Sequence, residues 1–219
     1  MPNWSERADA AAARYRDGEA RVGRNDDETD PRQRQLTRLG NAASAAGLCL
    51  LMAGRRDDAA VWLRLAAGRY RESWQDAPPD SWGRPIGAIK ALLLAGDDAA
   101  EAAGWALEAG AAEAGSPIGR YAGTLALLVL GRDAEAGPLA ATLERRDDFP
   151  PDVAAALAAL AGGDGAAYAA AVAAVLRSFE ARDEFLEDVA VADTVMVLQR
   201  LAAERGLAVE LPPSVRLPG

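Results

Sequence analysis

The chain has 219 residues, half of them hydrophobic, which is long enough to bury a core without disulfide bonds. Its formal net charge of −9 disfavours nucleic acid or an anionic membrane as the main partner. The absence of histidine excludes Ser-His-Asp and Cys-His catalysis and histidine-based metal sites.

The charge is distributed unevenly along the chain. Residues 1–38 have a net charge of 0 and residues 39–96 a net charge of +2, whereas residues 97–219 carry 9 basic and 20 acidic residues and reach −11. Such asymmetry is typical of a protein whose partner senses the sign of charge, or of a solvated acidic surface.

Cys49 lies in an apolar run and is expected to be an inert core residue. Because it is the single cysteine of the sequence, disulfide frameworks and zinc clusters are ruled out. The segment Met-Pro-Asn-Trp-Ser-Glu lacks the basic and then apolar pattern of a signal peptide, and no apolar run approaches 18 residues. We therefore expect a cytoplasmic protein that does not span a membrane.

Helix-start and helix-end signals alternate along the whole chain, so the sequence predicts an all-α protein of about ten helices. Asn3 or Ser5 and Asp57 or Asp58 are candidate caps, and Ser116 precedes a proline at the first helical position. The predicted helices cover about 4–18, 31–53, 58–74, 84–95, 98–107, 117–130, 133–143, 151–161, 165–182 and a last helix that starts between 184 and 190 and ends at 205. We expect residues 207–219 to form an extended, proline-rich tail.

Glycines at the predicted helix ends recur at a repeat-like interval. Gly54, Gly96, Gly131 and Gly162 are separated by 42, 35 and 31 residues, and each precedes an acidic residue and then alanine. Small residues in the helices that follow would let neighbouring helices approach closely. The spacing predicts one domain over residues 1–219, built from antiparallel helix pairs stacked side by side as an α-α superhelix. An irregular helical bundle is the alternative.

Residues 34–182 resemble the tetratricopeptide-repeat class of α-solenoids. In that class a glycine stands near the end of the first helix of a pair and an alanine follows five positions later, as Gly54 and Ala59 do here, with Leu63 and Ala66 at the next two positions. The resemblance implies a concave groove, lined by the first helices, that binds a peptide or a protein.

Cations recur near one turn of three successive first helices, and aromatic residues accompany them. Arginine side chains and an asparagine amide suit carboxylate ligands, and aromatic side chains supply apolar anchors. The candidate groove residues are Arg38, Asn41, Trp82, Arg84, Lys90, Arg120 and Tyr121. The alternative is that Trp82 packs at a helix entry, Tyr121 is half-buried and each arginine pairs with a nearby acid.

The densest acidic cluster is Asp183, Glu184, Glu187 and Asp188, followed by Asp193. On a helix Glu184, Glu187 and Asp188 would share one face and could bind a divalent cation or act as an acid–base pair, whereas on a surface turn they would be solvated. The chain has no phosphate-binding loop, and we expect no catalytic residue, metal site or cofactor.

Three functional hypotheses follow. The first is a helical-repeat scaffold that is not an enzyme and binds a protein or peptide, possibly acidic, in the groove of the first helices. The second is an acidic antagonist of the immunity type, whose charge would steer it onto a basic partner. The third is a carboxylate-based metal protein or enzyme. Apolar end faces of repeat arrays also make a homodimer possible.

Overall fold

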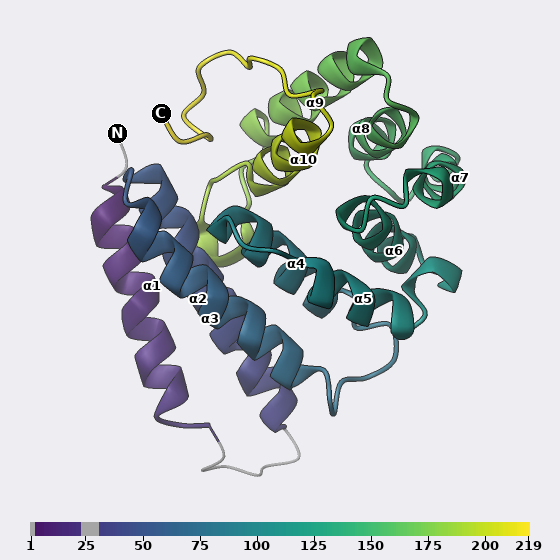
Figure 1. The fold of residues 1–219 in the computed structure, drawn as a ribbon. Coiled ribbons are helices and arrows are strands. Elements are labelled where there is room, and N and C mark those ends of the chain that lie inside the picture. The colour runs from purple at the N-terminus through teal and green to yellow at the C-terminus, as the bar shows by residue number, and fades with distance from the viewer. Residues whose placement is uncertain (1–2, 23–30) are drawn as a thin grey trace. The chain divides into compact units, whose positions relative to one another are not determined.

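The computed structural model describes residues 3–22 and 31–219 (Figure 1). Within these residues it contains ten α-helices, two short 3₁₀ turns and no β-strand. The prediction of an all-α protein with about ten helices is therefore confirmed. Among the described residues no helix is long and apolar enough to cross a membrane.

Three predicted helix starts have the expected side-chain caps. Asn3 accepts a hydrogen bond from the backbone N–H of Glu6, Ser116 from Gly119 and Asp164 from Ala167. Each cap satisfies a donor in the first turn that has no partner within the helix. These starts follow from local sequence alone.

Glycines with left-handed backbone conformation end several helices. Gly54, Gly96 and Gly131 have φ values of 75°, 81° and 66°, a region in which a residue without Cβ is not strained. The fourth predicted helix end, at Gly162-Gly163, is also observed, with Gly162 as the last helical residue and Gly163 (φ 68°) in the left-handed conformation. Gly163 therefore ends this helix, and the next residue, Asp164, caps the following helix.

Two predicted helix starts differ from the structure. The third helix begins at Arg56, so Asp57 and Asp58 lie within its first turn and do not cap it, although their charge still favours the helix N-terminus. The last helix begins at Asp193, because residues 183–192 leave helical geometry and include Glu187 at φ 54°. Acidic residues at helical spacing did not suffice to form a helix there.

The chain forms two compact units, which we describe separately. Unit 1 consists of the described residues of Met1–Asp97, Asp183–Val191 and Ser214–Gly219, and unit 2 consists of Asp98–Arg182 and Ala192–Pro213. Two compact units are compatible with one repeat array or with two domains, so the single domain over residues 1–219 stays a prediction. Residues 207–219 contain no helix and no strand.

Unit 1 contains the purple and blue helices of Figure 1, each packed against the next one along the chain. Its elements are α1 (Trp4–Glu19), α2 (Arg32–Met52), α3 (Arg56–Ser73), α4 (Gly83–Ala95) and the turn η2 (Leu186–Asp188). The ring of Tyr70 on α3 lies between Gly40 of α2 and Gly87 of α4, and a Cβ on either glycine would come within 2.7 Å of that ring. Two glycines thus let three helices close around one aromatic side chain.

Unit 2 also packs consecutive helices against one another. Its elements are α5 (Ala100–Glu108), the turn η1 (Ala111–Glu113), α6 (Pro117–Val129), α7 (Asp133–Glu144), α8 (Pro151–Gly162), α9 (Gly165–Glu180) and α10 (Asp193–Glu204). Leu125, Leu143 and Leu157 are completely buried in its core, and alanines fill the spaces between helices. The consecutive packing in both units is that of a helical-repeat arrangement.

Candidate functional site

Arg84 lies at the start of α4, and its guanidinium group is used inside unit 1. Its Nε donates to Ser73 Oγ at 3.0 Å, and Nη2 donates to Gln33 Oε1. Both acceptors belong to buried residues of neighbouring helices, and burial lowers the pKa of Arg84. Arg84 therefore ties α4 to α2 and α3, a role that the groove prediction did not include.

Trp82 and Asn41 also make contacts within unit 1. Trp82 is buried, its ring centroid lies 5.7 Å from that of Trp74, and its indole N–H donates to Asp80 Oδ1 at 3.0 Å. Asn41 Oδ1 accepts a hydrogen bond of 2.9 Å from the hydroxyl of Tyr70. The contact with Tyr70 occupies the Asn41 oxygen, and Trp82 packs against Trp74 directly before α4.

Three further candidates, Lys90, Arg120 and Tyr121, are divided between the two units. Lys90 is half-buried on α4 in unit 1, whereas Arg120 and Tyr121 are on α6 in unit 2. Arg120 Nε donates to the carbonyl of Ala114 at 3.0 Å, and the ring of Tyr121 lies 5.5 Å from that of Phe149. Neither unit by itself contains the whole set of seven, so a ladder of cations across three first helices stays a prediction.

Arg38 is exposed on α2 and lines a cavity of about 430 Å³ within unit 1. Arg14 and Arg21 line the same cavity from α1 and the turn after it, and two carboxylates, Asp17 and Glu187, also reach it. This volume is in the range of small-molecule and side-chain binding sites. In this cavity Arg38, a predicted groove residue, lies near two other arginines.

The buried part of this cavity's lining combines apolar residues with the amide side chain of Gln35. Gly18 of α1 and Leu39 and Ala42 of α2 also line the cavity, and a Cβ on Gly18 would lie 2.8 Å from a methyl group of Leu39. The two helices therefore touch at Gly18, and the charged side chains stand around the contact. A lining that combines apolar surface with cations suits a ligand that has a hydrocarbon stem and an anionic end.

Glu187 reaches the cavity from η2, far along the chain. Its carboxylate lies 3.3 Å from Arg14 Nη2, and Arg7 Nη1 donates to the carbonyl of Asp188 at 3.0 Å. Glu187 and Asp188 both have positive φ, which costs about 1 kcal/mol or more for each residue that is not glycine. A partly exposed ion pair contributes only about 0–1 kcal/mol, so these polar contacts do not outweigh that strain.

Sequence reasoning missed Arg14, Arg21 and Glu187 as members of this site. The sequence pattern places Glu187 in the acidic cluster, and it places neither Arg14 nor Arg21 among the candidate groove residues. The usable signal is the spacing of Arg14, Gly18 and Arg21 at i, i+4 and i+7, which brings two cations to one side of the chain although Arg21 lies in the turn after α1. Glu187 gave no comparable signal because it is distant in sequence.

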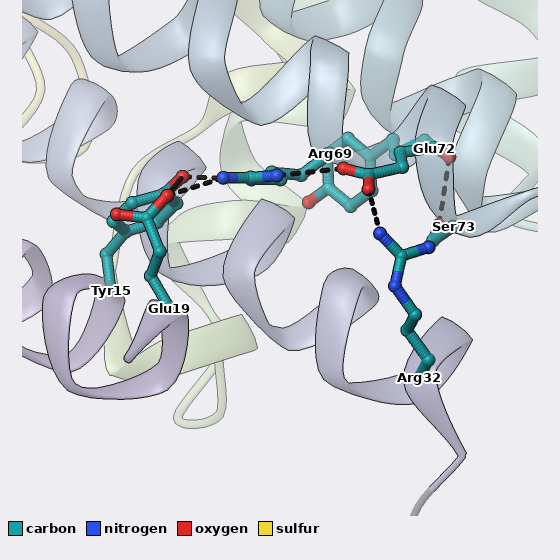
Figure 2. Close-up of polar contacts among 7 residues, drawn as sticks. Tyr15, Glu19, Arg32, Arg69, Glu72 and Ser73 are labelled. Carbon is teal, nitrogen blue, oxygen red and sulfur yellow. Dashed lines mark hydrogen bonds and ion pairs between the residues drawn. The ribbon is translucent and has the colours of Figure 1, made fainter. Parts of the chain in front are cut away.

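A network of ion pairs joins the first three helices of unit 1 (Figure 2). Arg69 of α3 donates to Glu19 at 2.5 Å, to Glu72 at 2.8 Å and to the hydroxyl of Tyr15 at 2.9 Å, and Arg32 of α2 also pairs with Glu72. Burial opposes the charge on Glu72, but hydrogen bonds from Arg69 and Arg32 outweigh it and lower the pKa of this carboxyl. The network fixes α1, α2 and α3 relative to one another.

The acidic cluster does not have the shared helical face that the cation-site hypothesis requires. Glu184 lies outside any helix, and Glu187 and Asp188 lie in η2 with left-handed backbone, so the three carboxylates do not share a helical face. In residues 3–22 and 31–219 no group of three or more histidine, cysteine, aspartate or glutamate side chains is placed to hold a metal ion.

Unit 2 has a second cavity, of about 400 Å³, that none of the predicted site residues lines. Leu107, Leu127 and Leu139 make it largely apolar, and the ion pair between Arg132 and Glu135 stands at its edge. This cavity lacks the excess of cations found in unit 1.

Comparison with known proteins adds no template for either cavity. No protein-family model, no curated protein and no solved structure matches this chain. The argument for function therefore depends on the geometry of the described residues.

Proposed function

We propose that the chain is a helical-repeat scaffold of the tetratricopeptide-repeat type that binds an acidic protein or peptide, and that Arg38 and its neighbours in the unit 1 cavity contact this partner. The observation that carries the proposal is the cavity itself, which is lined by three guanidinium groups, two from α1 and α2 and one from the turn after α1, and by the buried side chains of Leu39 and Ala42. Arginine presents a planar pair of N–H donors that matches a carboxylate, which is why such a site favours acidic side chains.

The packing of α2 and α3 supports the repeat assignment. Ala59, Leu63 and Ala66, at the positions of the family pattern, are completely buried. A Cβ on Gly47 would lie 2.6 Å from the side chain of Leu63, so α2 and α3 approach closely at this point. In the repeat motif, small residues allow the two helices of a pair to pack closely.

The proposal retains only one residue of the predicted groove as a first contact with the partner. Arg38 is the candidate whose side chain lines the unit 1 cavity, and none of the other six candidates is among the described residues that line it. We therefore assign binding to Arg38 first. Binding through Lys90 and Tyr121 remains part of the groove hypothesis.

Affinity purification from the source cells tests the proposal. We expect a partner retained by the wild-type chain to be lost from the Arg38→Glu variant, because the new carboxylate repels an acidic segment. The control is Arg56→Glu, which makes the same charge change at the exposed start of α3, outside the cavity. A partner retained equally by both variants would contradict the role of the cavity.

The second candidate function, an acidic antagonist that binds a basic protein, is favoured by the charge of the C-terminal part of the chain. Residues 97–219 carry the net charge of −11, and acids such as Glu101, Glu144 and Asp147 are exposed. Such a partner would be captured independently of Arg38 and released by salt. We propose the cytoplasm as the compartment for either function. The homodimer that the sequence makes possible is a separate hypothesis, which analytical sedimentation would test.

A further inference from the structure

We propose that the unit 1 cavity binds a glutamate side chain from an acidic segment of the partner, and that this chain's own Glu187 occupies the same place until the partner displaces it. The inference rests on the proposed function and names its ligand class: a peptide that combines acidic residues with apolar neighbours, as residues 183–191 do.

The first argument is that the chain itself already supplies an occupant. Glu187 lines the cavity together with Arg14, Arg21 and Arg38, although it lies about 150 residues or more further along the chain. Its carboxylate is 3.3 Å from Arg14 Nη2, and only 24% of its side chain is exposed. A site that takes a glutamate in this way is chemically suited to a glutamate from another protein.

The second argument is that the cavity retains room and positive charge with Glu187 in it. The volume of about 430 Å³ is that of the cavity with Glu187 at its wall, and among the described residues that line it three are arginines and two are carboxylates. The apolar surface of Leu39 and Ala42 can receive the hydrocarbon part of an acidic side chain or an apolar neighbour. A partner segment can therefore contact more of the cavity than Glu187 does.

The third argument is that the internal occupant is held in a way that permits release. Glu187 and Asp188 have left-handed backbone conformation, so leaving the cavity relieves strain. Leu186 beside them is 70% exposed and contributes little to the docking of the segment, whereas Val189 and Val191 are buried. The turn can therefore open locally while the buried valines anchor the chain.

The test measures binding of a fluorescent peptide that copies residues 183–191 to full-length variants, by fluorescence anisotropy. An internal competitor lowers the apparent affinity for the peptide, because only the open fraction of the protein binds. We expect Glu187→Gln to bind the peptide at least fivefold more tightly than the wild type. The matched control is Glu184→Gln, which removes the same charge outside the cavity and should behave as the wild type does.

A second pair of variants ties binding to the cavity. Added to Glu187→Gln, Arg14→Gln should weaken peptide binding at least tenfold, whereas Arg16→Gln, on the same helix but outside the cavity, should not. A peptide with glutamine at the position of Glu187 should bind neither protein. Circular dichroism of each variant shows that a loss of binding is not a loss of folding.

Three results would overturn the inference: equal affinity of the wild type and Glu187→Gln, binding that is indifferent to Arg14→Gln, or displacement of the peptide by inorganic phosphate as effectively as by unlabelled peptide. The last would make the cavity a general anion site. If the peptide fails to bind while capture of a cellular partner still requires Arg38, the internal occupant is wrong and the proposed scaffold function stands.

Discussion

Unit 1 and unit 2 are both built from consecutive antiparallel helices, but they hold those helices together by different means. In unit 1, ion pairs connect residues that are distant in sequence, as Arg69 of α3 does with Glu19 of α1, and Arg64 of α3 with Asp97 just after α4. Unit 1 also places glycines where helices meet the ring of Tyr70. In unit 2 the packing of alanine and leucine predominates.

The ion pairs of unit 2 are mostly local. Arg132 with Glu135 and Arg200 with Glu204 lie within one helical turn and are largely exposed, so they contribute little to tertiary structure. The exception is Arg205, whose guanidinium bonds Asp133 and the carbonyl of Leu128 and so ties α10 to the ends of α6 and α7. Both units therefore bury an apolar core, and unit 1 adds ion pairs between distant segments and close approach at glycines.

The largest effect should come from deleting buried volume in unit 2. Leu157→Ala removes a completely buried side chain of α8, and we expect the free energy of unfolding to fall by about 2–5 kcal/mol, because the cavity left behind cannot collapse fully. Chemical denaturation measures the change. Ile118→Ala, at a position that is 45% exposed, should alter it by less than about 0.5 kcal/mol. Similar losses for both would mean that unit 2 does not depend on this core.

The next effect tests close approach in unit 1. Gly87→Ala places a Cβ 2.7 Å from the ring of Tyr70 and should lower the free energy of unfolding by about 1–3 kcal/mol. Gly68→Ala, on α3 with nothing within 4 Å, should raise it by about 0.5–1 kcal/mol, since alanine favours a helix over glycine. A stabilising Gly87→Ala would show that the helices do not need to close around Tyr70.

Cys49 allows unit 1 to be followed separately in that experiment. It is completely buried on α2, and burial raises the pKa of its thiol to about 11. A thiol reagent at pH 8 should therefore label Cys49 only after unit 1 opens. Faster labelling of Gly87→Ala than of the wild type would locate its effect in unit 1.

The smallest effect concerns the ion-pair network and its dependence on pH. Because the pKa of Glu72 is lowered in the folded state, its contribution is present above the pKa of the unfolded chain and is lost as the pH falls through the folded-state value. We expect Glu72→Gln to be about 1 kcal/mol less stable than the wild type at pH 7, and the difference to shrink as the pH falls below the usual pKa of a glutamate and through the lower folded-state value. Denaturation of both proteins from pH 7 to pH 3 measures this, and a difference independent of pH would exclude the network as its cause.

Most of the secondary structure could be predicted from the sequence. Capping residues such as Asn3 and Ser116, and glycines such as Gly96, act on backbone groups three to five residues away, so their effect is visible in a short window. The start of the last helix could not be predicted in this way. The docking of η2 in unit 1, through Arg7 and Arg14, accompanies the departure of Glu187 and Asp188 from helical geometry.

The candidate site was less predictable than the helices. The sequence pattern predicts helices and shows that arginine and aromatic residues recur along them. Only the tertiary structure decided that Arg84 binds Ser73 and Gln33 inside unit 1, while Arg38 faces a cavity shared with Glu187. The physical reason is range, because a helix cap depends on its immediate neighbours, whereas the partner of a long charged side chain is chosen by the packing of helices far apart in the sequence.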